Sequence, residues 1–182
     1  MAKTIAILQP NYIPWKGYFD LINMVDEFIL YDDVQYTKGD WRNRNRYKSP
    51  EGIKWLTLPV KIKSLYTQML NDTIVTDENW AEKHWNTLER CYKHSDCYQD
   101  VASILKPCYE ENAKASSLCT IDFTFIQAIC DLLNIKTKLS WSSEHNVSGE
   151  KNDKLIQLCK ATNATHYISG PKASSYLDHT LF

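Results

Sequence analysis

Apolar residues at the start of the chain alternate between short runs and a helical repeat. Residues 4–8 form an isoleucine-rich run that is typical of a buried strand, and residues 28–30 form a second one. Between them, residues 15–25 repeat apolar side chains at helical spacing. Pro14 suits the first turn of this helix, where its missing N–H costs nothing. A strand, a helix and a strand of these lengths predict a right-handed parallel crossover.

The rest of the chain shows a helical middle and a return to strands. We expect helices over residues 78–92, 98–112, 122–133 and 151–161, and strands over residues 55–60, 136–141 and 166–169. Thr120, followed by Phe123, gives only a partial start signal for the third helix. Residues 32–49 have no sustained period and are too long for a simple connector, which indicates an active-site loop.

No repeat or linker divides the chain. The sequence therefore predicts one α/β domain over residues 1–182, with a Rossmann-like parallel sheet flanked by helices and a helical insertion at about 78–115. Strand carboxyl ends collect ligands in such folds, so the loop after residues 4–8 and the tip of residues 28–30 become the places to search.

Composition limits the classes of partner. A net charge of −1 over 182 residues argues against bulk attraction to nucleic acid or membranes. No apolar run could cross a bilayer, and the N-terminus lacks a signal peptide, so we expect a cytoplasmic protein without membrane insertion. Six cysteines without a C-x-x-C pair are read as reduced thiols. Cys91, His94 and Cys97 come closest to a zinc cluster, but coincidence explains them better, and no metal site is expected.

Polar groups follow both early strands. Gln9, Asn11, Tyr12 and Gly17 could line a nucleotide cradle at a helix N-terminus, or the two amides could simply satisfy turn backbone. Asp32 and Asp33 end the second strand. Their side chains should diverge on an extended chain, so that one binds a ribose, an amine or a metal-bound phosphate while the other caps the turn.

The segment after these aspartates is rich in cations. It carries Lys38, Arg42, Arg44 and Arg46, with Trp41, Asn43 and Asn45 between them. Such arginines can fork onto phosphates or a carboxylate. The interleaved aromatic residues also fit binding of single-stranded nucleic acid, but the balanced overall charge disfavours that interpretation. The plain alternative is a solvated run of charged residues on the surface.

Two further groups are candidates. Lys83 and His84 could contact phosphates or transfer protons from a helix, although a lone histidine is more often structural. A turn with Ser169, Gly170, Lys172 and Ser174 could clamp phosphate, or be a plain Gly-Pro turn. No Walker A motif, G-x-G-x-x-G fingerprint or G-x-S-x-G elbow occurs.

Several motifs together carry a family resemblance that spans nearly the whole chain. The chain resembles the WbqC-like proteins of bacterial surface-polysaccharide gene clusters through Gln9-Pro10-x-Tyr12-x-Pro14, Gly17-Tyr18-Phe19, Tyr31-Asp32-Asp33-Val34, Trp41-Arg42-Asn43-Arg44-Asn45, Trp80 with Lys83-His84, and Tyr167-Ile168-Ser169-Gly170. Relatives usually continue past the last motif into another strand and helix, so the resemblance implies a shortened member or a missing final layer.

A more distant resemblance links these spans to the adenylyl-transferring Rossmann-like superfamily of pantothenate synthetase and the class I synthetases. The His-x-Gly-His tetrad of that superfamily is replaced here by Trp15-Lys16-Gly17-Tyr18, which keeps the glycine and lacks both histidines. The resemblance implies an ATP-dependent ligase or acyl (aminoacyl) transferase that forms an amide on an amino sugar in O-antigen biosynthesis, with Mg²⁺ accompanying ATP.

The resemblance also implies roles for the candidate residues. The implied catalytic groups are His84, Asp32, Asp33 and Lys83, and the implied nucleotide- or substrate-binding groups are Gln9, Asn11, Tyr12, Gly17, Tyr18, Trp41, Arg42, Asn43, Arg44, Ser169 and Gly170. The expected partners are a nucleotide and a nucleotide-linked amino sugar, without nucleic acid, and a homodimer is compatible with them. The alternative is a catalytically inactive protein that binds a nucleotide or nucleotide sugar.

Overall fold

A computed structural model describes residues 2–62, 67–171, 173 and 177–181, so that Lys172 and Ser174 lie outside the described residues. The chain folds as two compact units. The first comprises residues 1–9, 15–33 and 135–182, and the second comprises residues 10–14 and 34–134. The second unit is therefore larger than the helical insertion that the sequence predicts at about 78–115.

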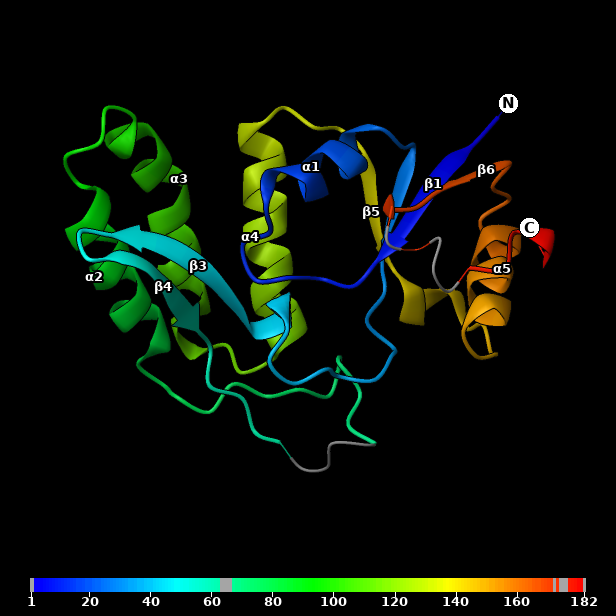
Figure 1. The fold of residues 1–182 in the computed structure, drawn as a ribbon, viewed down its shortest axis with the longest axis horizontal. Helices are drawn as coiled ribbons and strands as arrows, with labels where there is room; N and C mark the ends of the chain where they lie inside the picture. Colours follow the sequence, from blue (N-terminus) through cyan, green and yellow to red (C-terminus); the bar gives the residue numbers. More distant parts are fainter. Residues whose placement is uncertain (1, 63–66, 172, 174–176, 182) are drawn as a thin grey trace. The chain divides into compact units, whose positions relative to one another are not determined.

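The first unit contains a four-stranded parallel sheet (Figure 1). Its strands are β1 (Thr4–Leu8), β2 (Glu27–Leu30), β5 (Lys138–Trp141) and β6 (His166–Ile168). They pair in the order β5-β2-β1-β6, and every pairing is parallel. The Rossmann-like α/β fold and the parallel pairing of the first two strands are confirmed.

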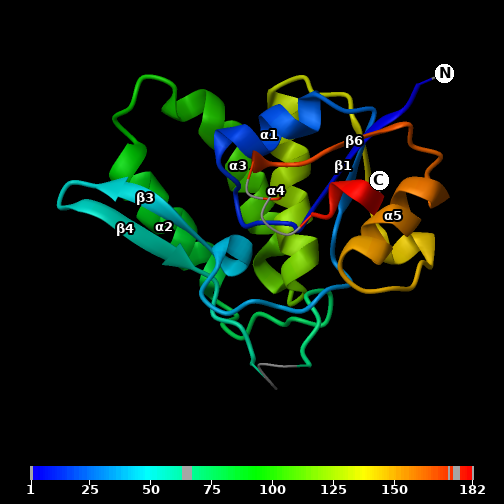
Figure 2. The ribbon, with the colours of Figure 1, turned by 45° about the vertical axis from the view of Figure 1, so that its right-hand side comes forward.

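Helices cover both faces of this sheet because its strands are apolar on both sides. Helix α1 (Lys16–Asn23) lies on the face of Phe28, whose ring centroid is 5.2 Å from that of Tyr18. Helix α5 (Asn152–Ala161) covers the opposite face, where Leu155 and Leu158 pack in one cluster with Ile29 (Figure 2). The unit also contains the 3-10 turns η3 (Ser142–His145) and η5 (His179–Leu181).

The second unit joins a hairpin to three helices. Strands β3 (Arg44–Ser49) and β4 (Gly52–Thr57) pair antiparallel, after the short helix η1 (Trp41–Asn43). Helices α2 (Trp80–Tyr92), α3 (Tyr98–Glu111) and α4 (Leu118–Leu132) follow, with η2 (Asn112–Lys114) between the last two. The core gathers aromatic rings, among them Tyr109 and Phe125 with centroids 4.7 Å apart.

The hairpin corrects the predicted loop over residues 32–49. Residues 44–49 form a strand that no apolar alternation announces, because its outward positions carry cations. The partner strand starts earlier than predicted and ends at Thr57 rather than at residue 60. Gly52 closes the turn with φ of +117°, a conformation that glycine adopts without the strain other residues meet.

Other boundaries also move. Helix α4 begins at Leu118 instead of residue 122, because the Ser117 hydroxyl caps it by accepting from the amide of Thr120. Pro14 lies before the N-cap residue Trp15, so it is not in the first turn of α1 as predicted. None of the helices in the described part of the chain is long and apolar enough to cross a membrane.

Candidate functional site

The strand order of the first unit reverses next to β1. The chain proceeds from β1 to β2 and β5 on one side and returns to place β6 on the other. Gln9 follows β1, and Ser169 and Gly170 follow β6. Because β1 and β6 are parallel, with Ala6 beside Ile168, these residues leave the sheet at the same edge. Ligands of doubly wound sheets bind at such a reversal.

Gly170 leaves space at this edge. A Cβ atom there would have no described heavy atom within 4 Å, whereas a Cβ on Gly17 would lie 2.1 Å from ring atoms of the Trp15 indole. Gly17 therefore makes room for a tryptophan of its own loop. Tyr18 is buried and donates its hydroxyl to the backbone oxygen of Gln9 over 3.1 Å, which fixes the start of the loop.

The two aspartates after β2 converge, which corrects the predicted divergence. Carboxylate oxygens of both Asp32 and Asp33 lie within hydrogen-bonding distance of the Ser142 hydroxyl, because the chain leaves the extended conformation after Leu30. Asp32 is buried and also accepts from the amide and the hydroxyl of Ser143. It therefore anchors η3 to the sheet edge.

Asp33 has a second partner besides Ser142. Its carboxylate lies 2.7 Å from Nζ of Lys154, and the same ammonium donates to the backbone oxygen of Asp33 over 2.8 Å. Sequence reasoning missed Lys154, which stands among the apolar residues of α5 with only 11% of its side chain exposed. A lysine on the apolar face of a predicted helix was the signal available.

The residues of the second unit that were predicted to bind a ligand form hydrogen bonds with other residues of the same unit. Arg42 donates to the Asn11 side chain, and Asn45 donates to the backbone oxygens of Tyr12 and Ile13. The Tyr12 amide in turn donates to the Trp41 oxygen over 3.2 Å. Asn43 is buried and donates to the Leu58 oxygen. The Trp-Arg-Asn-Arg-Asn motif thus fixes residues 11–13, including Ile13, whose φ is +45°.

His84 lies in a directed hydrogen-bond chain. Its Nε2 is 3.2 Å from the Thr57 oxygen, which can only accept, so Nε2 carries the proton and Nδ1 accepts from the Tyr12 hydroxyl over 2.9 Å. Tyr12 then accepts from the Tyr109 hydroxyl over 2.8 Å. Burial lowers the pKa of His84 to about 4 and raises that of Tyr12 well above its usual value.

Lys83, the neighbour of His84, points elsewhere. Its ammonium lies 2.6 Å from the carboxylate of Asp77, which precedes α2, and its side chain is exposed. With this ion pair, each of the four predicted catalytic residues has a protein partner. Asp32 and Asp33 belong to the first unit, and Lys83 and His84 belong to the second.

Asp122 is a buried carboxyl that sequence reasoning did not single out. It is 0% exposed on α4, and neither of its oxygens has a hydrogen-bond partner among the described residues. Burial raises its pKa well above the usual range, although the positive charge of Arg42 opposes this. An acidic residue between Leu118 and Phe125 on an apolar helix face was the available signal.

Two cavities lie away from the predicted residues. One of about 530 Å³ is lined by α5 and β6 residues, including Ile156 and Tyr167. The other, of about 320 Å³, lies between α2 and α3 and is lined by Trp85 and Tyr109 among others. Over the described ranges, no three His, Cys, Asp or Glu side chains come together to hold a metal ion.

Family comparison agrees with the motifs. The model of the WbqC-like protein family matches residues 9–182. The chain belongs to the WbqC-like protein family. The chain is also 44% identical over 180 residues to the protein of Mycobacterium tuberculosis (strain ATCC 25618 / H37Rv) named "Uncharacterized protein Rv1507c", and the match covers 99% of this chain and 78% of that protein. The resemblance to WbqC-like proteins that the sequence motifs indicate is thereby confirmed.

Proposed function

We propose that this WbqC-like protein is a nucleotide-dependent ligase or acyl (aminoacyl) transferase that forms an amide on an amino sugar of a surface polysaccharide. One observation carries the proposal: the strand order reverses between β1 and β6, where Gln9, Ser169 and the open Gly170 leave the sheet together. A nucleotide phosphate could approach the backbone of Gly170, because no heavy atom of the described residues lies within 4 Å of the place that a Cβ would take there.

The proposed chemistry has two steps. A carboxylate attacks the α-phosphate of ATP and releases pyrophosphate, which gives an acyl-adenylate. The amino group of the sugar then attacks the acyl carbon, an amide forms and AMP leaves. Mg²⁺ would enter with the ATP phosphates. Asp33 is the better candidate for contact with the ribose or the amine, because Asp32 is buried and used by η3.

One observation favours a second candidate, a protein that binds the nucleotide sugar without catalysis. All four predicted catalytic side chains are already engaged: Asp32 with Ser143, Asp33 with Lys154, Lys83 with Asp77, and His84 with Tyr12. A general base must be within reach of its substrate's proton, and His84 uses both ring nitrogens inside the protein.

Nucleotide binding is tested by thermal shift and calorimetry with ATP and Mg²⁺, comparing the wild type with Gly170→Val. The Cβ of the valine would meet no heavy atom of the described residues within 4 Å, so the melting temperature should hold while the ATP-dependent shift disappears. Gln157→Val, at an exposed position of α5, is the matched control and should keep the shift. Equal shifts in all three proteins would contradict a site at this edge.

Turnover separates the two candidates. The protein is mixed with ATP, Mg²⁺, glycine and a nucleotide-linked amino sugar, and AMP release is followed. Release that requires both co-substrates supports the ligase. Binding of the nucleotide-linked sugar without AMP release supports the binding protein, and failure to bind either nucleotide contradicts both.

A further inference from the structure

One face of the β3–β4 hairpin carries cations without a single carboxylate. Arg44, Arg46 and Lys48 alternate along β3, so their side chains share one face of the hairpin. Trp55 lies directly opposite Arg46 in the register, and Ile53 lies opposite Lys48. Neither strand contains an acidic residue. This outer face therefore has a local positive charge that the net charge of −1 conceals.

Two tryptophans hold the arginines by stacking. The Arg44 guanidinium lies 4.2 Å from the ring centroid of Trp55, and the Arg46 guanidinium lies 5.6 Å from that ring and 5.2 Å from the ring of Trp41. The two indoles are themselves 5.3 Å apart. Trp41 remains 39% exposed and Trp55 45% exposed. The cations and the two indoles, which are tilted by 46° to each other, thus form a platform that is open to solvent.

The guanidinium of Arg46 is fixed in place without an acceptor. Its side chain has no hydrogen bond or ion pair with any residue the structure describes, and it is exposed. Stacking on the indoles restricts its rotamers before any ligand arrives, which reduces the entropy cost of binding an anion. Planar N–H edges of this kind match the oxygens of phosphate.

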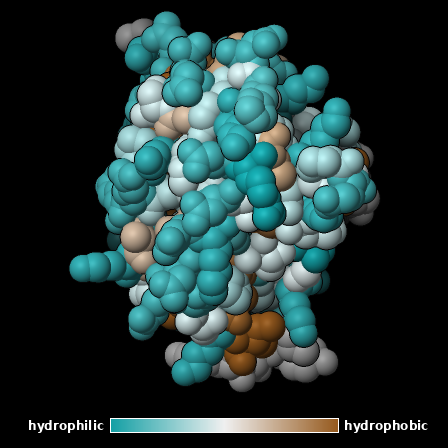
Figure 3. Space-filling view, turned by 90° about the vertical axis from the view of Figure 1, so that its left-hand side faces the viewer, coloured by the Kyte–Doolittle hydropathy of each residue, from teal (hydrophilic) through white to brown (hydrophobic). Residues whose placement is uncertain are grey.

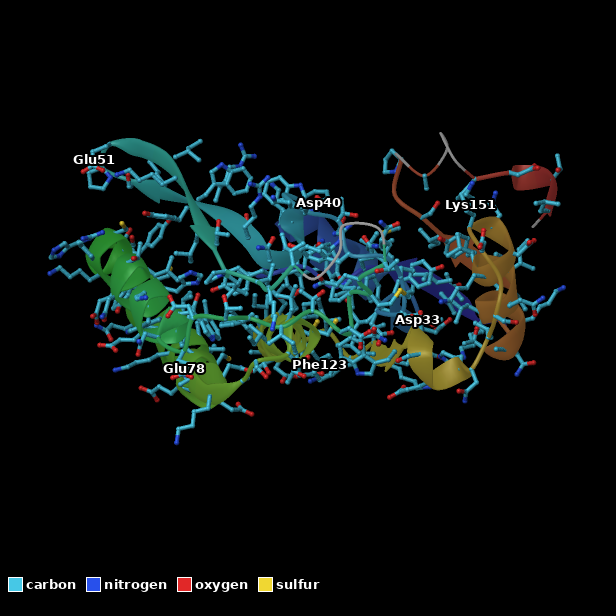
Figure 4. All side chains as sticks on the ribbon, turned by 90° about the horizontal axis from the view of Figure 1, so that it is seen from below. Asp33, Asp40, Glu51, Glu78, Phe123 and Lys151 are labelled. Carbon is cyan, nitrogen blue, oxygen red and sulfur yellow. The ribbon has the colours of Figure 1, made fainter. Side chains whose placement is uncertain are left out.

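The acidic residues that flank the platform are already paired. Asp40 lies near one end of the hairpin, where its carboxylate is 3.4 Å from Arg42, and Glu51 lies at the turn and pairs with Lys54 (Figure 4). Lys54 belongs to the opposite face of β4 by alternation. The cations of the outer face therefore have no competing carboxylate on their own strands.

We propose that this platform, defined by Trp41, Arg44, Arg46, Lys48 and Trp55, binds a short segment of single-stranded nucleic acid. Phosphates would lie along the row of cations, which are spaced about 7 Å apart on one strand face. Bases would stack on the exposed indoles and on the outer planes of the guanidiniums, as in single-strand-binding sites. The inference is independent of the proposed ligase activity, which concerns the first unit.

Other occupants fit the platform less well. A small ligand would favour a concave pocket, whereas this is the face of a two-stranded hairpin. A membrane would favour an apolar surface, but the side of the molecule that bears α2, α3 and the hairpin is mostly hydrophilic (Figure 3). An acidic polysaccharide would also be attracted by the positive charge. The flat guanidinium surfaces, however, favour the π-faces of bases over the saturated rings of sugars.

The test measures binding of a fluorescein-labelled dT12 oligonucleotide by fluorescence anisotropy between 50 and 200 mM NaCl. Contacts from three cations predict that log K falls with log salt at a slope of about −2. Arg46→Lys keeps the charge and loses the planar stack, so affinity should fall about fivefold at constant slope. Arg46→Ala should also reduce the slope by about 0.7.

Two further variants keep the proposal falsifiable. Trp55→Leu should weaken binding at least fivefold and reduce the quenching of tryptophan fluorescence by dT12. Lys114→Ala removes an exposed cation of η2, outside the hairpin, and should leave the affinity unchanged. Circular dichroism and melting temperature check that each variant is folded. Absence of saturable binding at 50 mM NaCl overturns the proposal. Equal losses in Lys114→Ala and Arg46→Lys, or tighter binding of polygalacturonate than of dT12, do so as well.

Discussion

The hydroxyl of Tyr12 lies 2.9 Å from Nδ1 of His84, and this contact joins a loop residue to α2 in the core of the second unit. The same hydroxyl accepts from Tyr109 on α3, so one oxygen bridges two helices. Trp80 and Phe125 contact the Tyr12 ring edge-on and exclude water from the hydroxyl. Tyr12, which the sequence suggested as a ligand contact, therefore also organises the helical core.

Tyr12→Phe should destabilise the protein by about 2 kcal/mol. The change preserves the ring but leaves Nδ1 of His84 and the Tyr109 hydroxyl without their buried partner. Urea denaturation followed by circular dichroism gives the free energy of unfolding. Tyr98→Phe is the matched control, because it removes an exposed hydroxyl bonded to Glu89 and should cost less than about 0.5 kcal/mol. Equal effects of the two changes would refute the bridging role.

Acidification should destabilise the protein through His84. Burial lowers its pKa to about 4, below the usual 6.5, so the unfolded state binds more protons between these values. The free energy of unfolding therefore falls as the pH decreases from about 6.5 to about 4, by up to about 3 kcal/mol. NMR titration of the imidazole checks this directly. A His84 resonance that titrates above pH 6 would contradict the assignment.

Asp122→Asn should stabilise the protein at neutral pH. The raised pKa of the buried carboxyl means that the unfolded state releases a proton that the folded state retains once the pH exceeds about 4, so stability decreases as the pH rises. The amide has a similar shape and no ionisation penalty. Thermal melts at pH 5 and pH 8 should show a gain that is larger at pH 8. Asp131→Asn, on the exposed side of α4, should change neither melt.

Glu27→Gln should remove a pH-dependent contribution to the free energy of unfolding at the start of β2. Burial opposes ionisation of Glu27, but hydrogen bonds from Lys3, Ser140 and Lys138 outweigh it and lower its pKa to about 2. The wild type should lose this contribution as the pH falls from about 4.5 through about 2, and the variant should be less stable by about 2 kcal/mol at pH 7. A variant as stable as the wild type at pH 7 would exclude the ion pair as a stabilising contact.

The sheet was predictable because its signal is local. Runs such as Thr4–Leu8 are apolar on both faces, which is what a parallel sheet covered by helices requires. The hairpin was not predictable, because β3 carries the half-buried Arg44 and the exposed Arg46 where a strand marked by its pattern would carry apolar residues, so no alternation of apolar residues marks it. The spacing of apolar residues reports which side chains are buried. It therefore gives no signal for a strand whose outward side chains are cations.

The sequence allowed us to predict which residues lie at the candidate site, but it did not allow us to predict which contacts they form. Asp32 and Asp33 follow β2, as the predicted strand requires. Their shared contact with Ser142, however, joins residues that are 110 and 109 positions apart in the sequence. Arg42 and Asn45 likewise contact residues 31 to 33 positions away. Such pairings depend on the folded chain, and a single sequence carries no local trace of them.

The pairing of β6 with β1 has a consequence for folding during synthesis. Lys3 and Thr165 meet across 162 residues, so the edge of β1 stays without this neighbour until β6 has been synthesised. Residues 34–134, which are contiguous and rich in helix, can reach their own compact state earlier. A nascent chain that is arrested before residue 160 should therefore expose the unpaired backbone groups of β1. Chaperones should bind the nascent chain most strongly at these lengths.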